Sequence, residues 1–220
     1  MGDHAEHIDP GRTALLLVDI QPDFMPGGPL AVANGDEILA PISRLIDRGK
    51  FQHMVATQDW HPPGHVSFAS AHAGAAAFDV IDLYGHDQVL WPDHCVQGTT
   101  GAELHGEVDW RAMAAVVRKG MEADTDSYSG FRNNWNPQGN RPATGLAGYL
   151  RDRGLDRLYL CGLARDYCVK WSAEDAAAAG FETTVIWDLT RAVNPAADDE
   201  VRRSLHAAGA RTIHGRALLT

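Results

Sequence analysis

The sequence predicts an α/β fold in three layers, a six-stranded parallel sheet with helices on both faces. Short apolar runs rich in β-branched residues alternate along the chain with longer amphipathic stretches. Such alternation is typical of parallel strands that are joined by helices. The 220 residues are also enough to bury one sizeable core. We therefore expect a single domain over residues 13–220, preceded by a flexible polar tail over residues 1–12.

Each element follows from its own stretch of sequence. Apolar runs of strand length predict strands at residues 13–20, 51–59, 114–120, 156–162, 182–188 and 210–214. Amphipathic stretches that end in a glycine suited to a C-cap predict helices at residues 36–49, 144–154, 166–180 and 196–209. The segment 61–109 is rich in Gly, Pro, His and Ala and has no clear period. A loop of that length inside a domain is either wrongly assigned or functional.

Composition excludes several classes of partner. Lys and Arg number 19 against 29 Asp and Glu, which gives a formal net charge of -10. A chain with this charge repels nucleic acid and anionic lipid, so we expect a small-molecule ligand and neither nucleic-acid nor membrane partners. The N-terminus lacks the basic and apolar parts of a signal peptide, which makes the cytoplasm the expected location. Three cysteines are too few for a disulfide framework, and a homo-oligomer is compatible with the sequence.

Four polar side chains follow predicted strands. In an open parallel sheet, ligands bind beyond the carboxyl ends of the strands. Asp19, Asp59 and Lys119 close three of the strands, and Cys168 lies beyond a fourth, at the opening of the next helix. Each has an ordinary alternative, because an aspartate can cap a turn, a lysine can end a strand in solvent and a free cysteine can pack in the core. Their coincidence at one edge of the sheet favours a site.

The position of Cys168 suits a nucleophile. The N-terminus of a helix and a neighbouring Lys119 both favour the thiolate, the form that attacks. Backbone N–H groups at the start of that helix can bind an oxyanion. Asp19 can take the thiol proton and pass it to a leaving amine, while Lys119 balances the charges. Together these groups suit the hydrolysis of an amide.

A metal site is the second chemical hypothesis. Asp59 and His61 lie two residues apart on the same side of an extended segment, and His94 offers a third ligand. One carboxylate and two imidazoles form a known catalytic zinc set and also resemble the set that holds non-haem iron. Spacing alone favours a metal site and no metal site about equally. Other histidines of the same segment compete as ligands: His65, His72, His86 and His105.

A series of motifs runs in order along nearly the whole chain beyond the first dozen residues: "ALLLVDIQPDFMPGGPLAV", "VATQDWHPPGHVSFAS", "WPDHCVQGTTGAELH", "RKGMEADTDSYSGF", "CGLARDYCV" and "DLTRAVN". They resemble the motifs of the nicotinamidase/pyrazinamidase branch of the isochorismatase-like cysteine hydrolases. The resemblance implies that Asp19, Lys119 and Cys168 form a catalytic triad. It implies hydrolysis of nicotinamide, and of pyrazinamide, to the acid and ammonia through a cysteine thioester, as a step of NAD salvage.

The resemblance also implies a cofactor and a pocket. Asp59, His61 and His94 would hold one divalent metal ion, most often zinc, with iron or manganese also known, and the ion would hold the pyridine nitrogen and water. The pocket would be aromatic. Its candidate residues are Phe24, Trp91 and Tyr128, although most aromatic side chains serve only to pack a core.

The turn before Cys168 carries further implications of the resemblance. Backbone N–H groups of Ala164 and Cys168 would form the oxyanion hole, beside a cis peptide bond between Leu163 and Ala164. Two positions depart from the family pattern. A further metal ligand found in some relatives would be His65 or Ser67 here, and Arg165 stands where a small threonine is more usual.

Three rival functions share parts of this pattern. A hydrolase of carbamoyl or ureido compounds keeps the Asp, Lys and Cys but generally lacks the metal set. A redox or binding protein would pair Cys161 with Cys168, and isochorismate hydrolysis proceeds without the cysteine. The triad and the metal set together favour the nicotinamidase.

Overall fold

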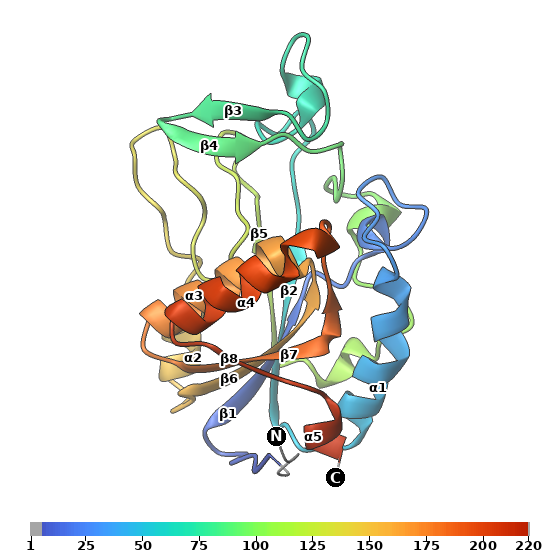
Figure 1. Ribbon diagram of the computed structural model, residues 1–220, viewed down its shortest axis with the longest axis vertical. Helices are drawn as coiled ribbons and strands as arrows, with labels where there is room; N and C mark the ends of the chain where they lie inside the picture. Colours follow the sequence, from blue (N-terminus) through green and yellow to red (C-terminus); the bar gives the residue numbers. More distant parts are fainter. Residues whose placement is uncertain (1–5, 220) are drawn as a thin grey trace.

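The computed structural model describes residues 6–219 and contains the expected parallel sheet (Figure 1). Its six strands run in the order β5-β2-β1-β6-β7-β8, and every pairing between them is parallel. Their bounds are β1 Thr13–Val18, β2 His53–Asp59, β5 Ala115–Lys119, β6 Arg157–Leu163, β7 Glu182–Arg191 and β8 Arg211–Ile213. All residues of β1 are buried, as expected for an apolar strand covered on both faces.

Helices cover the sheet on both faces. They are α1 Leu39–Asp47, α2 Leu146–Arg151, α3 Lys170–Ala178, α4 Asp198–Ala207 and the short α5 Arg216–Leu219. Figure 1 shows α3 and α4 side by side in front of the sheet and α1 beside it. The connection from β1 to β2 moves toward the β5 edge of the sheet, whereas the connections β5 to β6, β6 to β7 and β7 to β8 move toward the β8 edge. Because such crossovers are right-handed, α1 lies on one face of the sheet and α2, α3 and α4 lie on the other. The predicted three-layer α/β fold is therefore confirmed.

The segment 61–109 is an ordered structure of its own. It contains an antiparallel hairpin, β3 Val80–Leu83 and β4 His86–Val89, which lies beyond the carboxyl ends of the sheet strands (Figure 1). Backbone hydrogen bonds cross the segment, from His61 N to Cys95 O (3.0 Å) and from Gln97 N to His61 O (2.8 Å). The sequence did not predict this hairpin. "HDQV" in β4 is mostly polar, so it lacks the apolar run that identifies the other strands.

The end of β6 has a special backbone. Gly162 has φ +116°, and a Cβ there would lie 2.0 Å from Val18 O of the neighbouring strand. Only glycine fits this approach. The register between β6 and β7 also shifts between Leu160 and Gly162, and a bulge of this kind re-aims the chain at the end of a strand. It sets the direction of the turn that carries Cys168.

The first and last parts of the described chain lie against each other. Glu6 N donates to Ala217 O (3.0 Å), and the Arg12 guanidinium pairs with Asp156. Residues 1–5 of the expected tail lie outside the described residues. Over residues 6–219, no helix combines the length and the apolar character needed to span a membrane.

Candidate active site

The four polar residues singled out in the sequence meet at the carboxyl edge of the sheet. Asp19 follows β1, Asp59 ends β2, Lys119 ends β5, and Cys168 lies in the turn after β6. These strands are neighbours in the order β5-β2-β1-β6. Because parallel strands end on the same side, the sheet places all four side chains in one buried cluster.

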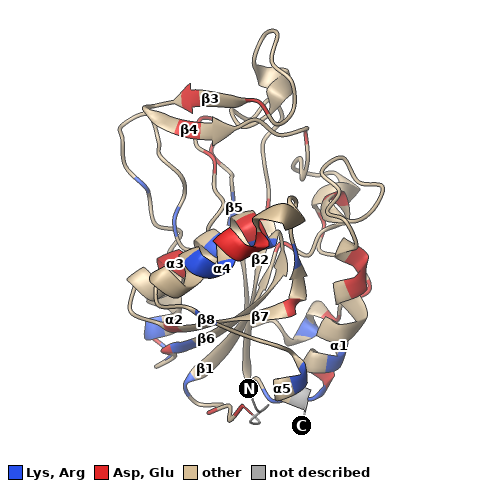
Figure 2. Cartoon of the chain, viewed as in Figure 1, with Lys and Arg blue, Asp and Glu red and all other residues tan. Residues whose placement is uncertain are grey.

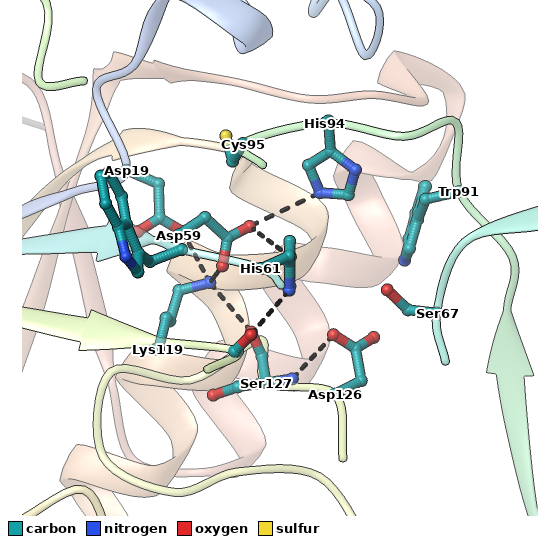
Figure 3. Close-up of polar contacts among 12 residues, drawn as sticks. Asp19, Asp59, His61, Ser67, Trp91, His94, Cys95, Lys119, Asp126 and Ser127 are labelled. Atoms are coloured by element: carbon teal, nitrogen blue, oxygen red, sulfur yellow. Dashed lines mark hydrogen bonds and ion pairs between the residues drawn. The ribbon is translucent and has the colours of Figure 1, made fainter. Parts of the chain in front are cut away.

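Lys119 is the centre of this cluster (Figure 3). Its Nζ lies 2.9 Å from Asp19 Oδ2 and 2.6 Å from Asp59 Oδ1. It also donates to Ser127 O at 2.9 Å and contacts Cys168 Sγ at 3.5 Å. One buried cation thus faces two carboxylates and the thiol, which keeps the charges of the site paired.

Burial and these charges set the protonation of the site. Burial alone would lower the pKa of Lys119, but Asp19 and Asp59 hold it well above its ordinary value. Burial alone would raise the pKa of Asp59, yet Lys119 and then His61 hold it well below its ordinary value. Burial raises the pKa of Asp19 despite the opposing charge of Lys119.

Burial of Cys168 opposes the effect of Lys119, which the sequence predicts to favour the thiolate. Burial raises the pKa of Cys168 well above its ordinary value, and the opposing effect of Lys119 is smaller. A thiol whose pKa is raised needs a base to remove its proton when it attacks. Asp19 is in place for that role, because a carboxylate oxygen of Asp19 and Sγ of Cys168 lie within 4.8 Å of each other.

Thr57 orients this carboxylate. Its hydroxyl donates to Asp19 Oδ1 at 2.5 Å, and Asp19 N donates to Thr57 Oγ1 at 3.2 Å. With Oδ1 engaged by Thr57, Oδ2 is directed to Lys119. Sequence reasoning missed Thr57, since 38 residues separate it from Asp19 and only the pairing of β1 with β2 brings them together.

Three donor atoms meet beside this cluster, as the metal hypothesis expects. Asp59 Oδ2 lies 3.3 Å from His61 Nε2 and 3.6 Å from His94 Nε2, all deeply buried. The other imidazole nitrogens are engaged by carbonyls, His61 Nδ1 with Gly120 O (3.0 Å) and His94 Nδ1 with Pro92 O (2.7 Å). Such contacts fix the ring orientation of metal-ligating histidines. This donor set fits a divalent ion.

Gly120 supports His61 in a way that no other residue can. Its φ is +65°, and a Cβ at this position would lie 2.3 Å from His61 Cε1. The glycine after Lys119 therefore lets the imidazole pack directly against the backbone that holds it.

His65 lies next to this donor set with both ring nitrogens already engaged. They contact Ser67 Oγ at 2.7 Å and Thr125 O at 3.2 Å. Burial, and then the neighbouring His61, lower the pKa of His65 to about 4. His65 also forms a second group of potential ligands with His61 and Asp126. His72, His86 and His105 belong to none of the potential metal groups found among residues 6–219.

A small aromatic pocket opens onto both the thiol and the donor set. Its wall includes the three predicted aromatic residues Phe24, Trp91 and Tyr128. The sequence missed five further lining residues: Leu30, Asp126, Ser127, Tyr167 and Val193. An apolar, aromatic lining with a few polar groups suits a small, largely apolar ligand.

The turn that carries Cys168 is a π-helix, Arg165–Val169, which continues into α3. A cis peptide bond joins Leu163 to Ala164 just before it, as the resemblance implied. Ala164 and Cys168 both line the pocket. Asp166 accepts the N–H groups of Val193 (2.9 Å) and Asn194 (2.8 Å), so the same turn fixes another wall of the pocket.

Arg165 points away from the pocket. Its guanidinium donates to Thr190 Oγ1 (2.8 Å) and Thr190 O (2.7 Å) and pairs with Asp198 Oδ2 at 2.5 Å. It also stacks 4.1 Å from the centre of the Trp187 ring. The departure from the family pattern at this position is therefore structural, since Arg165 ties the turn to β7 and α4.

Gln21 is another residue that the sequence did not reveal. Its Oε1 accepts Asp59 N (2.8 Å), and its Nε2 donates to Asp59 O (2.8 Å) and Ala102 O (2.9 Å). This side chain holds the backbone of Asp59 and joins it to the segment 61–109. Gln21 lies within the motif "ALLLVDIQPDFMPGGPLAV", but the motif does not reveal this role because the partners of Gln21 are all backbone groups.

Fold and site together define a class of protein: a parallel α/β protein whose thiol, lysine and carboxylates meet at the carboxyl edge of the sheet, as in isochorismatase-like hydrolases. Residues 13–216 match the model of the isochorismatase domain. The chain is 48% identical over 181 residues to the nicotinamidase of Acinetobacter baylyi, a match covering 82% of each protein. The chain therefore belongs to the isochorismatase family, on its nicotinamidase branch.

Solved structures agree with this assignment. A nicotinamidase/pyrazinamidase of Acinetobacter baumanii superposes with a TM-score of 0.89 at 41% identity, covering 96% of this chain and 99% of that one. A pyrazinamidase of Pyrococcus horikoshii in complex with zinc superposes with a TM-score of 0.73 at 34% identity, covering 92% and 99%.

Proposed function

We propose that the chain is an amidohydrolase that converts nicotinamide to nicotinate and ammonia, and pyrazinamide to the corresponding acid. The observation that carries this proposal is the contact of Lys119 with both Asp19 and Cys168, the last of which lines an aromatic pocket. Relatives at 35% to 48% identity are named nicotinamidases. We place the reaction in the cytoplasm, in the salvage of pyridine nucleotides.

The reaction proceeds through the thiol. Asp19 takes the proton of Cys168 as Sγ attacks the amide carbon, and the carbonyl oxygen becomes an oxyanion that the N–H groups of Ala164 and Cys168 stabilise. Asp19 then gives the proton to the amine, the C–N bond breaks, and ammonia leaves a thioester. Asp19 next takes a proton from water, whose hydroxide attacks the thioester, and the acid and the thiol are restored.

Asp59, His61 and His94 are the residues that would hold one divalent ion, with zinc as our first assignment and iron or manganese as alternatives. When bound, the ion supplies Lewis-acid coordination for the ring nitrogen of the substrate and for water. Their neighbours Gly120 and Pro92 keep the two imidazoles in place for this role.

The first test compares two buried cysteines. Cys168→Ala should abolish ammonia release from nicotinamide, by at least a thousandfold in kcat, because it removes the nucleophile. Cys161→Ala is the matched control, since Cys161 is equally buried in β6 and burial raises its pKa to about 12. It should keep activity near that of the unchanged chain. Full amidase activity in a correctly folded Cys168→Ala protein would reject the mechanism.

A further inference from the structure

The β3–β4 hairpin sends one buried polar side chain toward the pocket. Gln88 is the buried residue of β4, whereas the neighbouring Asp87 and, across the hairpin, Val80 are exposed. Figure 2 marks acidic positions and no basic ones along the two strands. A buried amide in an otherwise exposed hairpin requires partners that satisfy it.

Those partners are two residues that line the pocket. Gln88 Nε2 donates to Asp126 Oδ2 at 2.7 Å and to Tyr128 Oη at 3.1 Å, besides the carbonyl of its neighbour Val89. The orientation of the amide follows from chemistry, because a carboxylate accepts hydrogen bonds and would repel the amide oxygen. Asp126 and Tyr128 belong to the pocket wall that also contains Cys168.

Gln88 completes two sets of hydrogen bonds. Asp126 accepts Ser127 N through Oδ1 (2.7 Å), as Figure 3 shows, and Gln88 engages its other oxygen. Tyr128 Oη accepts Trp91 Nε1 (3.2 Å) in addition to Gln88. The two N–H groups of the Gln88 amide are shared among Asp126, Tyr128 and the Val89 carbonyl. Without Gln88, Asp126 Oδ2 and Tyr128 Oη each lose one of the contacts that hold them in place.

We propose that Gln88 is a positioning residue that sets the affinity of the pocket for its ring substrate, by fixing Asp126 and Tyr128 from the β3–β4 hairpin. The inference rests on the proposed function. Gln88 makes no hydrogen bond to Lys119, Asp19 or Cys168 among the contacts of the described residues. Its removal therefore acts on binding of the ring and leaves the thiol chemistry intact.

The test separates KM from kcat for nicotinamide. Gln88→Leu, of similar volume, should raise KM by about tenfold with kcat within about twofold, because a hydrogen bond to a charged group is lost from the wall that binds the ring. Gln88→Glu keeps the shape but puts a second carboxylate against Asp126, and it should raise KM at least as much. Asp87→Ala, on the opposite face of the same strand, should leave both constants unchanged.

Other outcomes overturn the inference. A KM within twofold of the unchanged chain in both Gln88 variants shows that the contact does not set affinity. A fall in kcat at constant KM shows that Gln88 acts on the chemistry instead. Should Gln88→Leu fail to fold, as judged by its thermal melting curve, Gln88→Glu alone decides by the same criteria. An unchanged chain that releases no ammonia from nicotinamide rejects the proposed function itself, which is a separate result.

Discussion

Lys119 is the residue on which the protonation of the site depends. Its ammonium group is fully buried and lies between Asp19, Asp59 and Cys168. The same cation touches a carboxylate of the proposed triad and a carboxylate of the proposed metal set. Occupation of the metal set and the proton affinity of Asp19 are therefore coupled through one side chain.

Removal of the Thr57 hydroxyl tests whether Asp19 is the base. Burial raises the pKa of Asp19, and the hydrogen bond from Thr57 opposes that rise. Thr57→Val removes the donor with little change of shape, so the pKa of Asp19 should rise further. Because Asp19 must be ionised to take the thiol proton, the acid limb of the pH profile of kcat/KM should move to higher pH. At acidic pH we expect a loss of about tenfold.

The matched control is Thr13→Val, because Thr13 is equally buried but begins β1 at the opposite edge of the sheet. It should leave the pH profile in place. An acid limb that stays put or moves to lower pH in Thr57→Val would show that Asp19 is not the base.

The sequence identifies the candidate site residues whose chemistry is distinctive, and it misses those whose role depends only on their position in the folded chain. Asp19, Lys119 and Cys168 could be predicted, since polar residues at strand ends stand out against apolar runs. Thr57 and Gln88 could not, because a threonine in a strand and a glutamine in a polar stretch are ordinary there. The aspartate that each contacts lies 38 residues away along the chain, and only the folded chain brings them together.

At the scale of elements, the turn from β6 into α3 concentrates most of the functional geometry. Its one π-helical turn carries Cys168 into the pocket, Asp166 toward the loop at Val193, and Arg165 toward β7. Each of three neighbouring side chains thus has a separate partner. The strand and the helix were predictable from their apolar periods, but the π-turn between them was not, because no periodicity extends over five residues.

A substitution of Arg165 tests how much the contacts of its guanidinium stabilise this turn. Arg165→Lys should lower the free energy of unfolding by about 2–4 kcal/mol, because one ammonium cannot replace a planar fork that reaches Thr190 and Asp198 together. The kcat/KM for nicotinamide should fall as well, since Cys168 lies three residues further along the turn. Urea unfolding and the ammonia assay measure the two effects.

The control is Arg202→Lys on α4. Arg202 stacks on the same Trp187 ring at 3.5 Å, and its one side-chain hydrogen bond, to Thr212 Oγ1, is long at 3.4 Å. We expect less than about 1 kcal/mol from it. Equal losses in the two variants would mean that the ring contact, and not the hydrogen-bonded fork, stabilises the turn.

At the scale of the whole molecule, the site joins two parts of different character. The sheet contributes Asp59, and the segment 61–109 contributes His61 and His94. The sheet could be predicted because its strands are apolar and regular. The segment could not, because its order comes from individual hydrogen bonds such as those of Gln21 and His61 rather than from a repeating pattern.

A bound ion should therefore link the sheet to this segment and stabilise the whole fold. At a free concentration a hundred times its Kd, a ligand that binds only the folded state adds about 2.7 kcal/mol to the free energy of unfolding. For a chain of this size, that raises Tm by roughly 5–10 °C.

Elemental analysis should find about one divalent metal ion per chain, and a chelator should lower Tm. His94→Ala should lose the metal and the dependence of Tm on it, while His105→Ala, which alters a histidine outside the donor set, should keep both. A Tm that ignores metal in the unchanged chain, or responds equally in His94→Ala, would show that the three residues of the donor set do not form this link.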